Sequence, residues 1–310
     1  MAKWVIPGWV LLFLGAFLLT LAFLTALWAP AKVQRVPLDV DTTTYLTGQA
    51  DKLNVVSGEV EDHPVKVTSL TRVDPKRSDG DTAVWVSTTC VNVDTGNPPD
   101  CLSEDDPRMI TDTIEKFASD RHTGVAVNDP SYVRTDTKYE GLVNKFPFNT
   151  EKKTYQYWDG LTEQAAPATY AGTDTIEGLQ VYRFETAIKD ASFELGPGIE
   201  GVYNLTKTMW VEPETGAIIN QEQHDVRTVA DSGTTVLDMS IAFTPETVSA
   251  NVDSAHDNLR LLTLVDRTVP LIGFILGPLL IVAGVALLVV ARRRSPESTS
   301  SRSDDHAYAG

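Results

Sequence analysis

The sequence predicts a mainly β protein: an antiparallel sheet or sandwich-like domain with a few helices, flanked by two transmembrane α-helices. Residues 6–28 and 269–291 form two uncharged apolar runs, one near each end of the chain. Between them, stretches of β-branched and aromatic residues alternate with clusters of Gly, Pro, Asn and Asp. Strands joined through such turns pair as hairpins, which favours an antiparallel sheet with one covered face.

Each apolar run is long enough to cross ~30 Å of hydrocarbon as an α-helix. Backbone amides inside lipid must find partners within their own segment, so both runs should be helical. Three arginines follow the second run and place residues 292–310 in the cytoplasm. Lys3 places residues 1–5 there too, although basic residues just after the first run weaken that assignment. We therefore expect a two-pass protein of the inner cell membrane, with residues 29–268 on the periplasmic side.

A cleaved signal peptide is the alternative for residues 6–28. The apolar core is too long for a signal peptide, and Ala29-Pro30-Ala31 is a poor small-residue cleavage site. An uncleaved anchor is the favoured interpretation. The tail, residues 292–310, is polar and Ser-rich without apolar periodicity, which predicts disorder.

The segment between the two spans is strongly acidic. The chain has 26 Lys and Arg, of which five lie outside residues 29–268, and 42 Asp and Glu, of which three lie outside. The segment therefore holds 21 basic and 39 acidic side chains, a net charge of about −18. Such a surface repels polyphosphates, so we expect no nucleic-acid partner. Solubility alone explains the acidity.

Cys90 and Cys101 are the two cysteines of the chain, and both lie between the spans. A close pair outside the cytoplasm is most simply a disulfide that closes a short loop. In the chain-entropy model such a loop contributes about 3 kcal/mol. A structural zinc site would need histidines nearby in the sequence, and there are none.

Several segments can be assigned to strands. Residues 65–73 and 82–93 are rich in β-branched residues and are joined by a turn, and Cys90 falls near the end of the second. Residues 203–212 and 217–229 form a second predicted hairpin. Its turn contains Gly216, at a position that favours positive φ.

Two helices are expected between the spans. Asp106 can cap the first, Pro107 suits its first position, and apolar residues from Met109 to Phe117 recur at three- and four-residue spacing. The second is an amphipathic juxtamembrane helix over residues 245–265. It packs either on its own domain or against another copy or a partner.

The sequence contains no recognisable catalytic motif. Residues 196–201 match G-x-G-x-x-G, but the residues that follow read as a strand rather than the helix that a dinucleotide site needs. The five histidines lack metal-ligand spacing, and neither HExxH nor GxSxG occurs. Asp120-Arg121-His122 is interpreted as a surface turn. We expect no enzyme, no metal site and no cofactor.

The aromatic residues are the better indication of function. An ordinary sheet core is the plain interpretation. Alternatively, a curved sheet tied near a membrane leaves part of its apolar face open to acyl chains, as pockets for lipids are mostly apolar with a few placed polar groups. The candidate ligand-binding residues are Phe146, Phe148, Tyr155, Trp158, Tyr182, Phe184 and Trp210.

Five stretches of the sequence follow one another in a recognisable order: RHTG at 121–124, EGLVNKFPF and KTYQYWD within 140–159, GLQVYRF at 178–184 and WVEPETG at 210–216. In this order they resemble the actinobacterial PorA-like family of two-pass envelope proteins. The resemblance covers most of the chain, including both apolar runs, and implies an actinobacterial cell envelope. The family label implies a porin, but strands that face lipid need an alternating apolar band, which an acidic segment between helical spans does not provide.

Some relatives look like periplasmic binders of trehalose mycolate lipids that work beside the mycolate-exporting membrane transporter. The resemblance thus implies a membrane-anchored lipid-binding accessory protein in envelope lipid transport and polar growth. Trehalose monomycolate is the candidate ligand, and the transporter complex is the candidate partner. The alternative is a scaffold subunit of an envelope transporter complex with no ligand of its own. The family offers no established catalytic residues to transfer.

Overall fold

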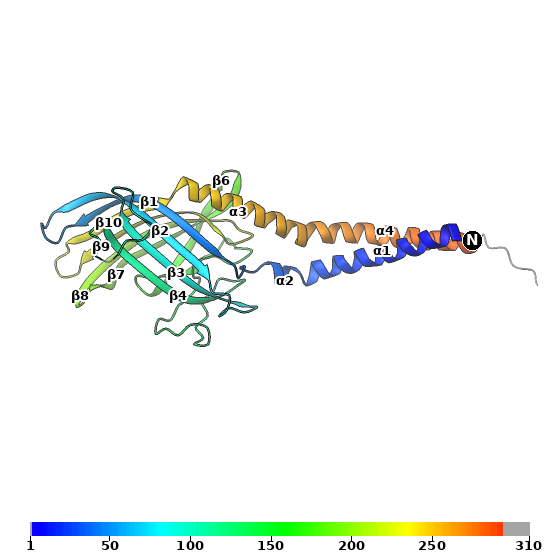
Figure 1. Ribbon diagram of the computed structural model, residues 1–310, viewed down its shortest axis with the longest axis horizontal. Helices are drawn as coiled ribbons and strands as arrows, with labels where there is room; N and C mark the ends of the chain where they lie inside the picture. Colours follow the sequence, from blue (N-terminus) through cyan, green and yellow to red (C-terminus); the bar gives the residue numbers. More distant parts are fainter. Residues whose placement is uncertain (1, 104, 294–310) are drawn as a thin grey trace, which may run out of the picture. The chain divides into compact units, whose positions relative to one another are not determined.

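The computed structural model describes residues 2–103 and 105–293 (Figure 1). The described chain divides into a β unit, Gln34–Arg260, and a helical unit formed by the segments before and after it. Residues 294–310, which make up most of the tail predicted to be disordered, lie outside the described residues.

The helical unit contains α1 (Ala2–Leu27), a short α2 (Pro30–Val33) and α4 (Val269–Arg293), which follows the π-helical turn η1 (Leu264–Thr268). Mean hydropathy reaches 2.6 in Val5–Leu27 and 2.8 in the continuous helix that ends at Arg293. Both are long and apolar enough to cross a membrane. Two such helices with a mainly β unit between them fit a membrane-anchored protein.

Glycines bring α1 and α4 into close contact. A Cβ added at Gly15 would lie 2.7 Å from the carbonyl oxygen of Gly277, and one added at Gly284 would lie 2.8 Å from that of Gly8. Helices in lipid associate by van der Waals packing, because the surrounding acyl chains remove the hydrophobic drive, and small residues permit the closest approach. The glycine spacing therefore suits a helix pair in a bilayer.

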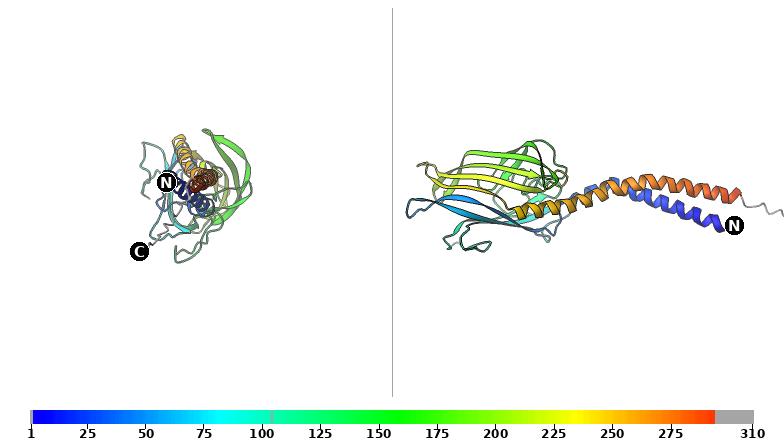
Figure 2. Two further views of the ribbon diagram at one scale, coloured as in Figure 1. Left: turned by 90° about the vertical axis from the view of Figure 1, so that its right-hand side faces the viewer. Right: turned by 90° about the horizontal axis from the view of Figure 1, so that it is seen from above.

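The β unit is one antiparallel sheet of ten strands in the order β4-β3-β2-β1-β10-β9-β8-β7-β6-β5. The strands are β1 (Asp41–Leu53), β2 (Val60–Val73), β3 (Thr82–Val93), β4 (Met109–Asp120), β5 (Tyr155–Asp159), β6 (Gln164–Ile176), β7 (Leu179–Gly196), β8 (Ile199–Val211), β9 (Ile218–Val229) and β10 (Thr235–Phe243). Figure 2 shows how the sheet curls. The predicted mainly β antiparallel fold is confirmed, and both predicted hairpins occur, as β2–β3 and β8–β9.

Short segments of the intervening chain connect the two edge strands, β4 and β5. Isolated bridges join Ser119 of β4 to Ala126, Val125 to Leu142, and Leu142 to Tyr157 of β5. These bridges complete a ring of backbone pairing, so the curled sheet closes into a barrel at this end. We call it the bridged end, and it also holds the β6–β7 and β8–β9 turns. The opposite end, which holds the β1–β2 and β7–β8 turns, is the far end.

The pairing register assigns the two faces of the sheet. Leu46 of β1 pairs with Val67 of β2 and Phe243 of β10, and these positions share the inner face with most of the buried residues. On the outer face, Asp51 pairs with Asp62 and Asp238. Apolar side chains inside and charged side chains outside indicate a sheet whose convex surface faces water.

The prediction of a helix from Asp106 to Phe117 is wrong. Met109–Asp120 is strand β4, which pairs with β3 from Thr82↔Asp120 to Asn92↔Met109. The segment is rich in Ile and Thr, whose branched Cβ atoms favour strands, and pairing with β3 satisfies its backbone along its whole length. The Asp106 carboxylate instead accepts two hydrogen bonds from the Arg108 side chain.

The amphipathic helix is confirmed as α3 (Pro245–Thr263). Val252 and Ala255 of α3 are buried against Leu179, Val181 and Ile219 of the sheet. Of the two alternatives for this helix, packing on its own domain is the one that the structure contains. The glycine-rich residues 196–201 form the turn region between β7 and β8, in which Pro197 and Gly198 connect the strands, and a strand follows them as predicted.

The predicted disulfide joins Cys90 and Cys101, with a Cα–Cα distance of 5.4 Å. The loop that it closes is also held by side chains of the sheet. The Asn92 amide donates to the carbonyl oxygen of Asp100 at 3.2 Å, and the Lys66 amine lies 2.8 Å from the Asp100 carboxylate. The bridge thus fastens the β3–β4 connection to the outer face.

Candidate functional site

Four of the seven predicted aromatic residues lie together at the bridged end. Phe146, Tyr155, Tyr182 and Phe184 belong to one cluster, in which Phe146 and Phe184 are fully buried. The ring centroid of Phe146 is 4.6 Å from that of Phe184 and 5.5 Å from that of Tyr155. Such close packing makes this group part of the core of the β unit.

Phe146 reaches this cluster from a loop, not from a strand. Its backbone N–H donates to the carbonyl oxygen of Gly216 at 3.0 Å, which ties the loop to the β8–β9 turn. Gly216 has a φ of +72°, and a Cβ there would lie 2.2 Å from the Phe146 carbonyl oxygen. A glycine is therefore required at this turn. The Phe146 loop closes the bridged end of the barrel.

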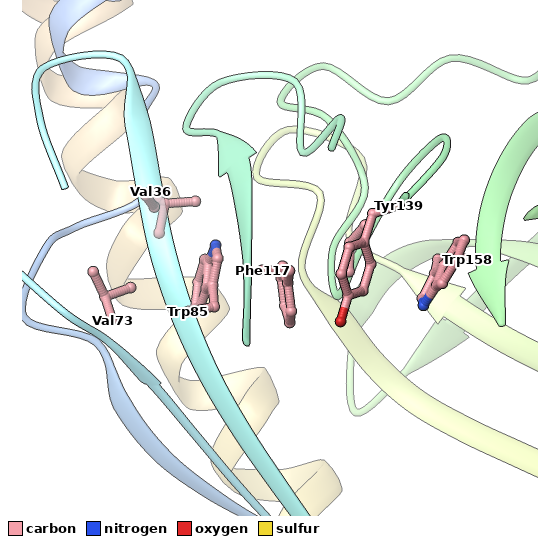
Figure 3. Packing of buried hydrophobic residues seen from close by; sticks show 8 residues of the cluster. Val36, Val73, Trp85, Phe117, Tyr139 and Trp158 are labelled. Carbon is pink, nitrogen blue, oxygen red and sulfur yellow. The ribbon is translucent and has the colours of Figure 1, made fainter. Parts of the chain in front are cut away.

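Trp158 lies in a second cluster, shown in Figure 3. Trp85 of β3, Phe117 of β4, Tyr139 of the connecting loop and Trp158 of β5 follow one another, with centroid separations of 6.2, 5.6 and 4.7 Å. The row therefore runs from one edge strand across the connecting chain to the other. It joins β4 and β5 at the bridged end.

Trp210 lies on the outer face of the sheet, in the cluster beneath α3. Its indole N–H donates to the Asp174 carboxylate at 2.9 Å, and the same carboxylate accepts from Arg183 at 3.3 Å. Because Trp210 and the Phe146 cluster are on opposite faces, they cannot line one pocket. The seven predicted residues do not form a single surface.

Phe148 belongs to a third environment, between a histidine and a lysine. The His122 ring stacks on it at 5.7 Å, and the Lys145 amine lies 3.8 Å from its ring centroid. The Lys145 amine also donates to the carbonyl oxygen of Thr215 at 3.1 Å. Burial lowers the pKa of Lys145 to about 7, against the opposing effect of the Asp120 carboxylate.

We expect this lysine to make stability depend on pH. Its pKa is about 7 in the folded state against an ordinary value of 10.5, so the unfolded chain binds more protons between these values. The stability of the native protein therefore rises with pH across that range. Lys145→Met lacks this titration, so the thermal midpoint of the variant relative to the native protein should be highest below pH 7 and should fall towards pH 9.5.

Thermal unfolding of the full chain in detergent at pH 6, 7, 8 and 9.5 measures this difference. Lys189→Met, at an exposed lysine of β7, controls for the loss of one positive charge. A constant difference between Lys145→Met and the native protein at all four pH values would contradict the assignment.

A band of polar side chains crosses the inner face between the apolar clusters, and the sequence analysis missed it. The register places its members on the inner face of two groups of neighbouring strands, β1–β4 and β7–β9, and most are only half-buried. They are Thr44, Ser69, Thr71, Ser87, Thr89, Glu115, Thr186, Lys207 and Gln223. Period-two alternation within single strands could have assigned each residue to a face, but only the strand order shows that they are neighbours.

Lys207 is the central charge of this polar band. It pairs in register with Thr186 and Gln223, and its amine makes no ion pair or hydrogen bond with the described residues. Burial lowers the pKa of Lys207. The carboxylates of Asp159, Asp225 and Glu115 oppose this shift. The ring of Tyr157 lies 6.0 Å from the amine. Lys207 is half-buried, and a charged amine in such surroundings without a close partner lowers stability.

Buried polar atoms near Lys207 also lack partners. Asp225 is 2% exposed and accepts a hydrogen bond from Arg227 at 2.9 Å, yet its Oδ1 has no donor. The Nε of Arg227 and the Oγ1 of Thr186 are likewise unpaired. Burial raises the pKa of Asp225 and also that of Glu115. Native proteins pair nearly all such atoms, so this group is suited to bind water or a polar ligand.

Two pockets give access to the inner face. A pocket of about 520 Å³ lies at the far end and includes Lys52, Glu61, His63 and Arg108 in its lining. A second, of about 450 Å³, lies where β4 faces the end of β5, and we call it the seam pocket. Glu115 belongs to both the seam pocket and the polar band. Within residues 2–103 and 105–293, no group of three or more His, Cys, Asp or Glu could hold a metal ion.

Comparison with known proteins agrees with the resemblance found in the sequence. A family model described as Porin PorA matches residues 7–286. Porin PorA of Corynebacterium resistens is 22% identical over 287 residues, covering 61% of this chain and 68% of that protein. The family model runs from within α1 to within α4 and so includes the whole β unit. The chain therefore belongs to the Porin PorA family.

Proposed function

We propose that this protein is a membrane-anchored, non-enzymatic binding protein whose curled sheet holds the polar head of an envelope glycolipid. The observation that carries the proposal is the polar band around Lys207. It lies on the inner face of a closed sheet, and buried atoms without partners occur at Thr186 within the band and at Asp225 and Arg227 beside it. A ligand that supplies both donors and acceptors would remove the cost of burying them.

A sugar head group suits this environment because each hydroxyl both donates and accepts. The unpaired Arg227 Nε needs an acceptor, whereas the unpaired oxygens of Asp225 and Thr186 can take donors. The positive charges of Lys207 and Arg227 partly offset the negative charges of the nearby carboxylates, those of Asp159, Asp225 and Glu115. The polar band therefore does not select a strongly charged ligand. The family resemblance supports trehalose monomycolate as the ligand and the mycolate-exporting transporter complex as the partner.

A pore formed by this sheet is the function that the name of the relative suggests. The outer face argues against it, because charged side chains on lipid-facing strands destabilise a membrane barrel, by up to ~2–4 kcal/mol for Arg or Lys at the bilayer midplane and by less for Asp or Glu. Asp51, Asp62 and Asp238 lie side by side on that face. We therefore propose that helices anchor the chain in the inner membrane, that both termini are cytoplasmic, and that the β unit works in the periplasm.

The proposal predicts that Lys207→Met weakens ligand binding without lowering the stability of the protein. Removing a hydrogen bond from a charged donor to the ligand costs about 1.5–3 kcal/mol, so binding should fall at least about 10-fold. Removing this half-buried amine, which has no close partner among the described residues, should at the same time leave stability unchanged or increase it.

The full chain, in nanodiscs free of glycolipid, is incubated with trehalose monomycolate, and the bound lipid is measured by native mass spectrometry. Lys189→Met is the matched control, since it removes an exposed lysine by the same substitution. We expect the native protein and the control to retain one glycolipid. If all three proteins retain the same amount, or if none does, the proposed function is wrong.

A further inference from the structure

The edge of β4 that faces β5 lacks backbone pairing along most of its length. On its other edge, β4 pairs with β3 from Met109 to Asp120. On this edge, within the described part of the chain, the bridge nearest the far end is at Ser119. Separating β4 from β5 beyond that bridge would therefore break no strand pairing. No other neighbouring pair of strands in this sheet has that property.

The seam pocket lies at this unpaired edge. Its lining comes from β4, from the loop between β4 and β5, and from the end of β5 with the turn after it. The residues are Thr113, Ile114, Glu115, Lys116, Val133, Arg134, Thr135, Thr137, Tyr139, Trp158, Gly160 and Glu163. Hydroxyl and charged groups predominate at its rim. A polar head group can therefore enter this pocket without leaving hydrogen-bonding surroundings.

Glu115 and Gly160 meet across the seam. A Cβ added at Gly160 would lie 2.9 Å from Oε1 of Glu115, so the carboxyl rests against a backbone that has no side chain. Glu115 also pairs in register with Ser87 of the polar band, and its charge acts on Lys207. The same side chain thus separates the seam pocket from the inner face and belongs to both.

Contacts around the Glu115 carboxyl allow it to move. It makes no ion pair with the described residues, and burial raises its pKa against the opposing effect of the nearby Trp158 side chain. The rim of the pocket is held by a hydrogen bond from the Thr137 hydroxyl to Glu163, at 3.2 Å between exposed groups. Opening the seam requires the Glu115 side chain to rotate and this exposed hydrogen bond to break, while the aromatic row from Phe117 through Tyr139 to Trp158 still joins β4 and β5 at the bridged end.

We propose that the seam pocket is a lateral port, through which the polar head of the ligand passes between β4 and the end of β5 to reach the polar band. Glu115, resting on Gly160, is the latch of this port. The proposal rests on the proposed function and specifies the route by which the ligand enters. A ligand that is drawn in sideways can leave its apolar chain outside the barrel.

To test the port, its two sides are cross-linked either before or after the protein is loaded with lipid. The full-length double variant Glu115→Cys/Gly160→Cys is treated with bismaleimidoethane, either before or after incubation with trehalose monomycolate. Cys90 and Cys101 are joined to each other and do not react. Cross-linking before incubation should reduce loading at least about 10-fold, and cross-linking after loading should slow release by a similar factor.

The control variant is Thr206→Cys/His224→Cys, whose positions pair in register on the outer face of β8 and β9. Its cross-link should change neither loading nor release. If the uncross-linked latch variant does not bind, Lys116→Cys/Glu163→Cys, from opposite sides of the same pocket, takes its place.

The possible outcomes separate the two proposals. Equal loading of either seam variant before and after cross-linking would overturn the port and leave the proposed function intact. Failure of the native protein to bind any glycolipid would remove the proposed function and the port with it. Loss of loading only when the cross-link precedes the ligand, together with trapping when it follows, supports the port.

Discussion

Replacing Phe146 by alanine is expected to lower the free energy of unfolding of the β unit by about 3–5 kcal/mol. The side chain is fully buried among Phe184, Met209 and Val211, and the loop that carries it closes the bridged end. Truncation removes the transfer free energy of a whole ring and leaves a cavity that neighbouring strands cannot fill. The neighbouring strands are held by pairing on both sides, so they cannot move in to fill the cavity.

Denaturant titration of the full chain in detergent, followed by tryptophan fluorescence, measures this loss. Phe148→Ala is the matched control, since Phe148 lies in the same loop and is only half-buried against His122 and Lys145. Its truncation should cost clearly less. Equal losses in both variants would show that the loop does not act as a closure of the barrel.

The double variant Cys90→Ala/Cys101→Ala is expected to lose about 3 kcal/mol of stability. The bridge spans 11 residues of sequence and constrains the unfolded chain, while its loss also frees the β3–β4 connection. The native protein under reducing conditions should lose about the same amount. Chemical unfolding of the oxidised, reduced and double-variant proteins makes the comparison.

A loss close to zero for the double variant would indicate that the other contacts of the loop suffice. Those contacts are the hydrogen bond from Asn92 and the ion pair of Lys66 with Asp100. Lys66→Met in the disulfide-free background then tests whether the ion pair carries the stability.

Local patterns in the sequence predicted the parts of the fold that local physics determines. The two apolar runs, the β2–β3 and β8–β9 hairpins, helix α3 and the disulfide are each specified by neighbouring residues. Strand β4 was missed because its apolar residues fit a helical period as well as a strand. Only its pairing with β3, a tertiary contact, decides between the two.

The candidate site was less predictable because it depends on strand order. Lys207 comes near Asp159 and Asp225 only because β8 is flanked by β7 and β9 and the sheet curls until β5 faces β4. Aromatic residues attracted attention in the sequence, but they are also the residues that fill cores. Four of the seven do so around Phe146, while Trp210 supports α3 on the other face.

The pairing of β1 with β10 has a consequence for biogenesis. Leu46 pairs with Phe243, so the first strand to be synthesised waits for the last before its second edge is paired. Contacts of such high sequence separation fold slowly, and a waiting strand edge is prone to aggregate. The β unit can therefore complete its fold only when nearly all of it has been synthesised, just before α4 follows. The cell would need to shield the unpaired edge of β1 throughout that interval.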